Sequence, residues 1–389
     1  GLLEATAVNA ATLEVEPGPG EPPERRRLAA PQIRFDFDEQ DRLTLLQGLP
    51  ARQTDPKAPR RPVITTEPQP PGTPGGWRVE GDRFAARLDP ETGAVKVADF
   101  DGAVAAQEPG RKAWAGRAVF DEAAGLATLT GDPRVTQEKD GSELRGRRIE
   151  IGTRTENVRA SGAVRHTIGR ASGRSRKGML SGEEPTVLVC REFDYDAKSR
   201  TARYREEALL RSGEDEIRAP LIVLEDREGG RRLLASGGTT SLLHPRRGKE
   251  AKEAPAAVEA RSREMVYEEA AGRIVYTGEV RIRQGDIVTA SPEAVVVLTK
   301  DGGDVLRLEA YEPVEVTQGA RRATGQRGTY TPADETFVLV GEKVVLHDVD
   351  RRLEGRILTF AVGSDRIRVD GREEERTEAV FRGKEPTKP

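Results

Sequence analysis

The feature of this sequence that most constrains its fold is a spacing that recurs ten times along the chain. A small residue is followed three and five positions later by two apolar residues, and a turn and a second alternating segment come next. Once three long intervals are set aside, the units begin about 30 residues apart, in the range of stacked repeat architectures. The spacing therefore predicts an array of similar units. Their first residues are Ala30, Gly81, Ala115, Gly146, Cys190, Ala219, Ser262, Ser291, Gly325 and Gly355.

Apolar and charged residues alternate within each unit, as in RFDFDEQ at 34–40 or EVRIRQ at 279–284. A period of two is typical of strands with one buried face. Between two such segments lies a turn rich in Asp, Pro and Gly, so each unit is predicted to be a hairpin. Because one hairpin cannot bury its apolar face alone, we expect the units to stack in sequence order into an all-β, elongated sandwich or jelly-roll tube, open at both ends. The clearest turns are at 38–42, 89–93, 121–125 and 331–335.

The three long intervals contain segments that interrupt the pattern and read as insertions. They divide the chain, without evidence for separate globular domains. The predicted parts are an N-terminal segment with the first unit (1–53), a Pro-rich insertion (54–76), repeats (77–168), a polar loop (169–184), repeats (185–245), a charged loop (246–255), a C-terminal domain (256–381) and a tail (382–389).

Charge and hydropathy exclude several classes of protein. The 63 Lys and Arg residues nearly cancel the 66 Asp and Glu residues, and the two signs are interspersed, so we expect no nucleic-acid partner. The sequence contains no run of about 18 apolar residues, so it predicts no transmembrane helix. Nothing near Gly1 resembles a secretion signal, and we expect that any signal or membrane anchor has been removed.

Residue patterns for catalysis are scarce in this sequence. The three histidines lie in different units without metal-ligand spacing, and Cys190 is the only cysteine. There is no Gly-x-Ser-x-Gly motif and no phosphate-binding loop. We therefore predict no enzymatic activity, no cofactor and no metal. The carboxylates of Glu192, Asp194 and Asp196 leave a carbohydrate-active β array as an alternative.

The segment from about 253 to 381 resembles the OstA-like family of periplasmic lipopolysaccharide-transport proteins, the LptA and LptC type. The resemblance is carried by VYTGEVRIRQGDIVTASPEAVVVL (275–298), by the stretch from LEAYEP to VVLHD (308–348) and by LEGRILTFAVGSDRIRVDG (353–371). Earlier units follow the same pattern more loosely, most clearly at 114–137. The resemblance implies a twisted β jelly roll, here of about ten stacked OstA-like repeats of about 30 residues, located in the periplasm.

By the same resemblance, the inward side chains line a groove for the acyl chains of lipopolysaccharide or a related glycolipid. The implied partners are an inner-membrane ABC-type extractor complex and an outer-membrane translocon, joined by edge-strand pairing near Ala30 and Gly355. The periodicity alone does not separate an open groove from a closed core, so a structural or adhesive β rod stays an alternative. Four outward arginines are candidates for lipid phosphates or for plain solvated surface: Arg281, Arg283, Arg321 and Arg322. The predicted groove residues are Ala294, Val296, Leu298, Leu306, Leu308, Val314, Val316, Tyr330, Phe337, Leu339, Val344, Leu346, Leu358 and Phe360.

Overall fold

The computed structural model of the 389-residue chain is all-β, as the alternation predicts. Neighbouring strands pair antiparallel, and no helix occurs in the part of the chain that the structure describes. The chain divides into two compact units: unit 1 is Gly1–Gly173 with Val189–Ser199, and unit 2 is Arg174–Leu188 with Arg200–Pro389. The described residues are 3–15, 24–50, 60–68, 76–169, 185–244, 257–299, 305–348, 351–361, 367–370 and 378–381.

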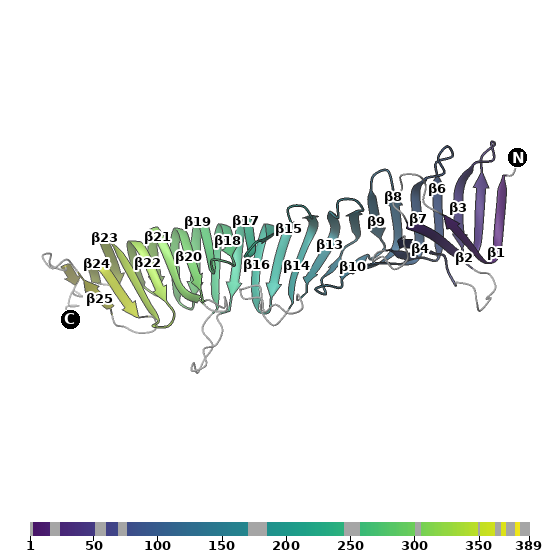
Figure 1. Ribbon diagram of the computed structural model, residues 1–389. Helices are drawn as coiled ribbons and strands as arrows, with labels where there is room; N and C mark the ends of the chain where they lie inside the picture. Colours follow the sequence, from purple (N-terminus) through teal and green to yellow (C-terminus); the bar gives the residue numbers. More distant parts are fainter. Residues whose placement is uncertain are drawn as a thin grey trace, which may run out of the picture. The chain divides into compact units, whose positions relative to one another are not determined.

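Unit 1 contains long strands and pairs of short strands (Figure 1). Strand β14 (Thr186–Asp196) contributes the residues from Val189 onward. The others are β1 (Glu4–Val15), β2 (Glu24–Phe37), β3 (Leu43–Leu49), β4 (Val63–Pro68), β5 (Arg78–Glu80), β6 (Arg83–Leu88), β7 (Val95–Glu108), β8 (Arg111–Asp121), β9 (Leu126–Thr130), β10 (Arg134–Gln137), β11 (Glu143–Arg145), β12 (Arg148–Gly152) and β13 (Val158–Ile168).

Unit 2 is more regular, because each strand from β15 to β24 pairs with the next one in the sequence (Figure 1). Two short strands, β25 and β26, both pair with β24. The strands are β15 (Thr201–Ser212), β16 (Asp215–Arg227), β17 (Gly230–Leu243), β18 (Val258–Glu268), β19 (Arg273–Gln284), β20 (Ile287–Leu298), β21 (Val305–Gln318), β22 (Arg321–Thr331), β23 (Thr336–Asp348), β24 (Arg351–Ala361), β25 (Ile367–Asp370) and β26 (Glu378–Phe381).

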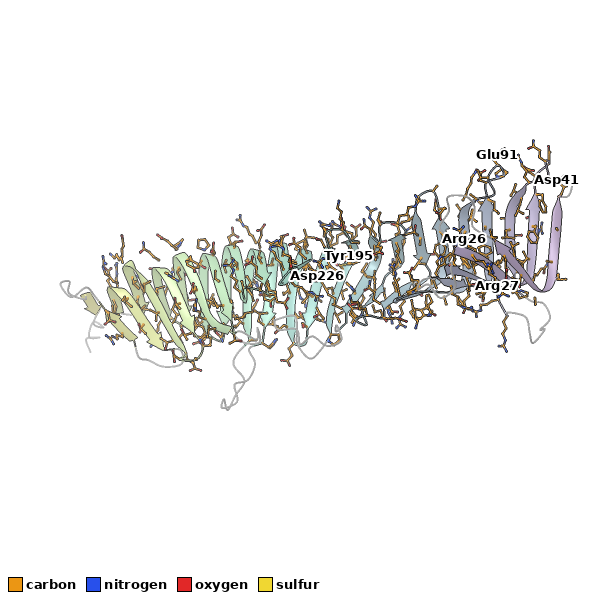
Figure 2. All side chains as sticks on the ribbon, in the orientation of Figure 1. Arg26, Arg27, Asp41, Glu91, Tyr195 and Asp226 are labelled. Carbon is orange, nitrogen blue, oxygen red and sulfur yellow. The ribbon has the colours of Figure 1, made fainter. Side chains whose placement is uncertain are left out.

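The four predicted turns lie between strands, and aspartates hold three of them. The Asp38 carboxylate accepts hydrogen bonds from the backbone N–H groups of Gln40 and Arg42, and Asp89 does the same for Glu91 and Thr92. These backbone donors and the Arg42 side chain hold the pKa of Asp38 below its usual value. Figure 2 shows Asp41 and Glu91 at the tips of their turns. Short-range hydrogen bonding of Asp thus reverses the chain where the sequence predicts it.

Each long strand changes direction near its middle, at a position that we call the corner. In the β18–β19 ladder, Arg261 opposes Arg281, and the next paired residue is Glu264, opposite Thr277. The residues of β19 that absorb this register shift are left-handed: φ is +79° at Gly278 and +54° at Glu279. Such a bulge bends the strand and separates it into two halves.

The corners create two facing layers of half-strands, with apolar side chains between them. In unit 2, layer A includes the ladder of 258–261 with 281–284, and layer B includes the ladder of 264–268 with 273–277. The ladder hydrogen bonds from β15 to β24 run within each layer. Away from the corners, therefore, these two layers meet through side chains.

The corner explains the spacing of three between a small residue and the next apolar one. Ser262 and Met265 both face the interior, although an unbent strand would place them on opposite faces. The Ser262 hydroxyl donates to the carbonyl of Glu264 at 2.7 Å, and the Ser291 hydroxyl donates to that of Glu293 at 2.8 Å. A short side chain with a donor fits the inside of the corner. Buried Cys190 occupies the same slot, with its Sγ 3.1 Å from the Glu192 carbonyl oxygen.

A strand lies within the predicted 54–76 insertion. Residues Val63–Pro68 form β4, which pairs with β2 and β5. Residues 63–66, with the sequence VITT, are all β-branched, and such residues favour strands. They pair with β2 although prolines surround them. The 169–184 and 246–255 segments lie almost entirely outside the described residues. The number of repeats stays a prediction.

Candidate functional site

The candidate site is the interior of unit 2, where the side chains predicted to face inward are brought together. Most of them are less than a tenth exposed. They come from both layers, because the corner lets one strand contribute to each. The buried members are Ala294, Val296, Leu298, Leu308, Val314, Val316, Phe337, Leu339, Val344, Leu346 and Leu358.

Three predicted members, Tyr330, Phe360 and Leu306, are not in this set. Tyr330 is half-buried, and its ring stacks on Phe337 of the neighbouring strand with 6.5 Å between centroids. Partial burial raises the pKa of the Tyr330 hydroxyl, because the charged phenolate is poorly solvated there. The side chain of Phe360 lies outside the described residues.

The prediction that Leu306 faces the interior is wrong. The β20–β21 ladder pairs Val297 with Arg307 and then Leu298 with Val305, so Leu306 is the extra residue of a bulge. Its side chain is 49% exposed, whereas that of Leu308 is 6% exposed. A bulge shifts the alternation by one residue, which simple counting from Leu308 does not anticipate.

A cavity of about 30 Å³ lies between the two layers on the side away from the corners, enough for a water molecule or two but not for an acyl chain. The cavity is lined by Ile282, Gln284, Ile287, Thr289, Leu308, Tyr330 and Phe337.

The interior also contains hydroxyl groups that the aliphatic pattern of the C-terminal units does not predict. Ser241 of layer A and Tyr276 of layer B share a hydrogen bond of 2.8 Å, and both are about 1% exposed. Burial raises the pKa of Tyr276 to about 12. Thr239 and Ser262 form a second buried hydroxyl pair at 2.7 Å. The sequence does indicate that these two side chains face inward, because Tyr276 and Ser241 occupy the same alternate positions as the inward apolar residues of their strands.

Charged side chains cover the outer faces of the strands. Arg322 forms an ion pair with Glu315 at 2.6 Å, and Arg321 lies 3.5 Å from Asp348. Glu309 accepts a hydrogen bond from Tyr311 at 2.5 Å, and this bond and Arg307 keep the pKa of Glu309 below its usual value. Arg281 and Arg283 are exposed. Carboxylates thus already pair with two of the four arginines proposed for phosphate contact.

The described ranges contain neither a metal-binding cluster nor a membrane-spanning helix. They contain no group of three or more His, Cys, Asp or Glu side chains arranged to hold a metal ion. Nor do these ranges contain a helix of the length and hydropathy that a membrane crossing requires.

Residues 258–366 match the family model described as "LptA/(LptD N-terminal domain) LPS transport protein". The match lies within unit 2 and covers the buried column from Val258 to Leu358. An uncharacterised protein of Rhizobium meliloti (strain 1021) is 31% identical over 83 residues, which are 20% of this chain and 45% of that protein. The chain thus spans less than half of this relative.

Among solved structures, the chain is similar to LptH of Pseudomonas aeruginosa, described as the LptA homologous periplasmic component of a lipopolysaccharide transport device. The TM-score is 0.28 and the sequence identity is 16%, over 34% of this chain and 84% of LptH.

Proposed function

We propose, starting from residues 258–366 as an OstA-like segment of the lipopolysaccharide-transport family, that this chain is a periplasmic carrier that shields acyl chains from water. The cargo is lipopolysaccharide or a glycolipid of similar chemistry. The observation that carries the proposal is that the family-matched segment is also the segment in which β18 to β24 all bury apolar side chains between two layers.

The mechanism requires the layers to part on the side away from the corners. From β15 to β24 the ladder hydrogen bonds run within the layers, so parting breaks side-chain contacts and leaves the ladders intact. An acyl chain in the gap replaces those contacts at roughly 0.8 kcal/mol for each methylene removed from water. Sugars and phosphates remain outside with the charged side chains. This role needs no catalytic residue.

Edge strands are the proposed contacts with other components of the transport system. Among the described strands, β1 pairs with β2 alone, and its Val8 and Val15, like Leu3 just before it, are about half exposed or more. An open strand edge accepts a strand from another β protein. We assign such pairing to jelly-roll domains of an inner-membrane ABC-type extractor and an outer-membrane translocon, so that the chain bridges the two membranes.

A site-specific crosslinking experiment tests the carrier function. A photoreactive amino acid is placed at Leu308 or Phe337, the full chain is purified without detergent, and lipopolysaccharide is added before illumination. Leu306 is a matched control, since it is an exposed leucine on the same strand as buried Leu308. We expect adducts at Leu308 and Phe337 and none at Leu306. Absence of adducts at Leu308 in folded protein would show a closed core and favour a structural β rod.

A further inference from the structure

The two tryptophans of the chain both lie in unit 1 but face different surroundings. Trp114 is an outward residue of β8, 38% exposed, with the Arg134 guanidinium 5.0 Å from its ring centroid. Trp77 precedes β5 and stacks on the ring of Phe120, with 6.5 Å between centroids and 14° between planes. Trp77 lies on the interior side, because its ring stacks on Phe120 and because it stands two residues from buried Val79, on the same face of the chain.

The Trp77–Phe120 stack connects the two layers of unit 1. The Trp77 carbonyl accepts a hydrogen bond from the Thr66 N–H of β4, and the Trp77 N–H donates to the Thr66 hydroxyl. Strand β5 pairs with residues 105–107 of β7. Phe120 of β8 instead opposes Ala98, on the other side of the β7 corner. That corner lies at Gly102, where φ is +79°. The two rings therefore meet across the gap between the layers, several residues from the corner.

Further aromatic rings lie beneath this stack. Phe120 meets Phe100 edge to face at 6.0 Å, and Phe100 packs against Phe84 at 4.8 Å. Phe84 and Phe100 are almost fully buried, whereas Trp77 is 37% exposed. Trp77 is thus the outermost ring of a continuous aromatic path from the surface to the interior. On the corresponding side of unit 2 there is instead the small cavity beside Gln284 and Tyr330.

We propose that Trp77 and Phe120 form an aromatic closure over the interior of unit 1, which an acyl chain must displace to enter there. The inference rests on the carrier function and names the residues that control access in this unit. Stacking of side chains closes the gap, so the Trp77 ring can swing outward with the ladders unchanged. The surface beneath is apolar, with Val79, Val104 and Phe100 buried, and suits a hydrocarbon chain and not a sugar or phosphate.

The two tryptophans allow a test by fluorescence quenching. In the full-length Trp114→Phe variant, Trp77 is the reporter, and in Trp77→Phe, Trp114 is the reporter. The probe is a lysophospholipid with a dibromostearoyl chain, below its critical micelle concentration, because bromine quenches indole only on contact. We expect Trp77 to lose most of its emission relative to the unbrominated lipid and Trp114 to lose almost none. Equal quenching of both would indicate surface adsorption and overturn the proposal.

A second pair of variants, in the Trp114→Phe background, tests closure as distinct from contact. Phe120→Leu keeps an apolar side chain but removes the ring stack, and should lower the lipid concentration at half-quenching about two- to tenfold, the range that one aromatic pair supplies. Phe193→Leu makes the same change to a buried ring of unit 1 that packs against His166 and not against this aromatic path, and it should leave that concentration unchanged. An unchanged value for Phe120→Leu would disprove closure.

The outcomes separate this inference from the carrier function. Crosslinking at Leu308 without quenching of Trp77 would refute the closure and leave the carrier function standing. Failure of both experiments in folded protein would refute the carrier function itself.

Discussion

Units 1 and 2 turn the same kind of corner in two ways. In unit 1, some strands are interrupted at the corner, with Gly81 between β5 and β6 and Gly146 between β11 and β12, although β7 continues through its own. In unit 2, strands such as β18 and β20 continue through the corner with a bulge at Ser262 and Ser291. The small residue is thus required by the bend and not by the continuity of the strand.

The side chains that pack in the interiors of the two units also differ. Unit 1 packs aromatic rings in series, with Phe100 between Phe84 and Phe120. Unit 2 combines aliphatic side chains with hydroxyl pairs, and Ser241 and Tyr276 join its layers by a hydrogen bond. Stacking resists opening through dispersion and burial, whereas a buried hydroxyl pair must be satisfied by a partner. One backbone plan therefore accommodates two kinds of contact between layers.

The largest effect on stability is expected from removing one large buried ring from the interior of each unit. Phe100→Ala and Phe337→Ala each remove a ring that is about 1% exposed, and each should lower the local free energy of unfolding by about 3–5 kcal/mol. Since repeat contacts are mainly between neighbours, hydrogen exchange should accelerate in β6–β8 for the first variant and in β22–β24 for the second. Equal acceleration in both units for either variant would show that the units unfold together.

The burial of Tyr276 should make unit 2 the more alkali-sensitive unit. The folded pKa of Tyr276 is raised to about 12 from its ordinary value of 10.0, so its stabilising contribution is complete below pH 10 and is lost as the pH rises toward 12. That change in pKa corresponds to roughly 3 kcal/mol. Chemical denaturation across this pH range should show a steeper loss for the wild type than for Tyr276→Phe. Parallel pH profiles would contradict the shift.

Substitution of a corner glycine should lower the free energy of unfolding by about the same amount in the two units. Gly102 and Gly278 both have φ of +79°, and an added Cβ would approach Asp82 and Arg263, respectively, within 3 Å. Alanine at either site should cost about 1–3 kcal/mol of unfolding free energy. Gly285, with φ of +58° and nothing within 4 Å of an added Cβ, is the control and should be less affected. Thermal unfolding of the three variants measures the difference. If Gly285→Ala destabilised the protein as much as Gly278→Ala, the loss of stability would not be explained by steric contact of the added Cβ.

Outer ion pairs near the corners should contribute least. Arg83 pairs with Asp101 in unit 1, and Arg263 pairs with Glu279 in unit 2, on side chains that are about half exposed or more. Exposed pairs are screened by salt and contribute little. Double-mutant cycles at low and high salt should give small couplings in both units that vanish at high salt. A large, salt-resistant coupling at either pair would contradict this ranking.

Much of the candidate site follows from the sequence because inward positions obey a local rule. Val314, Val316, Val344 and Leu346 are buried as their alternation predicts. The rule fails at Leu306, where a bulge adds one residue to β21. The sequence carries no separate marker of that bulge, since whether Leu306 or Leu308 faces inward depends on pairing with β20.

The sequence by itself determined the strands, the turns and the place of the small residues. These depend on side chains close along the chain: alternation chooses a face, Asp38 and Asp89 close turns, and Ser262 bonds to the carbonyl of Glu264.

Only the tertiary structure decided which side chains meet between layers. The contacts of Trp77 with Phe120 and of Ser241 with Tyr276 join residues that lie on strands far apart in sequence. The pairing of β4 with β2 depends in the same way on a neighbour that no local pattern specifies. The physical reason is that these contacts are set by ladder register and by the space left at each corner, which exist only once the layers have assembled.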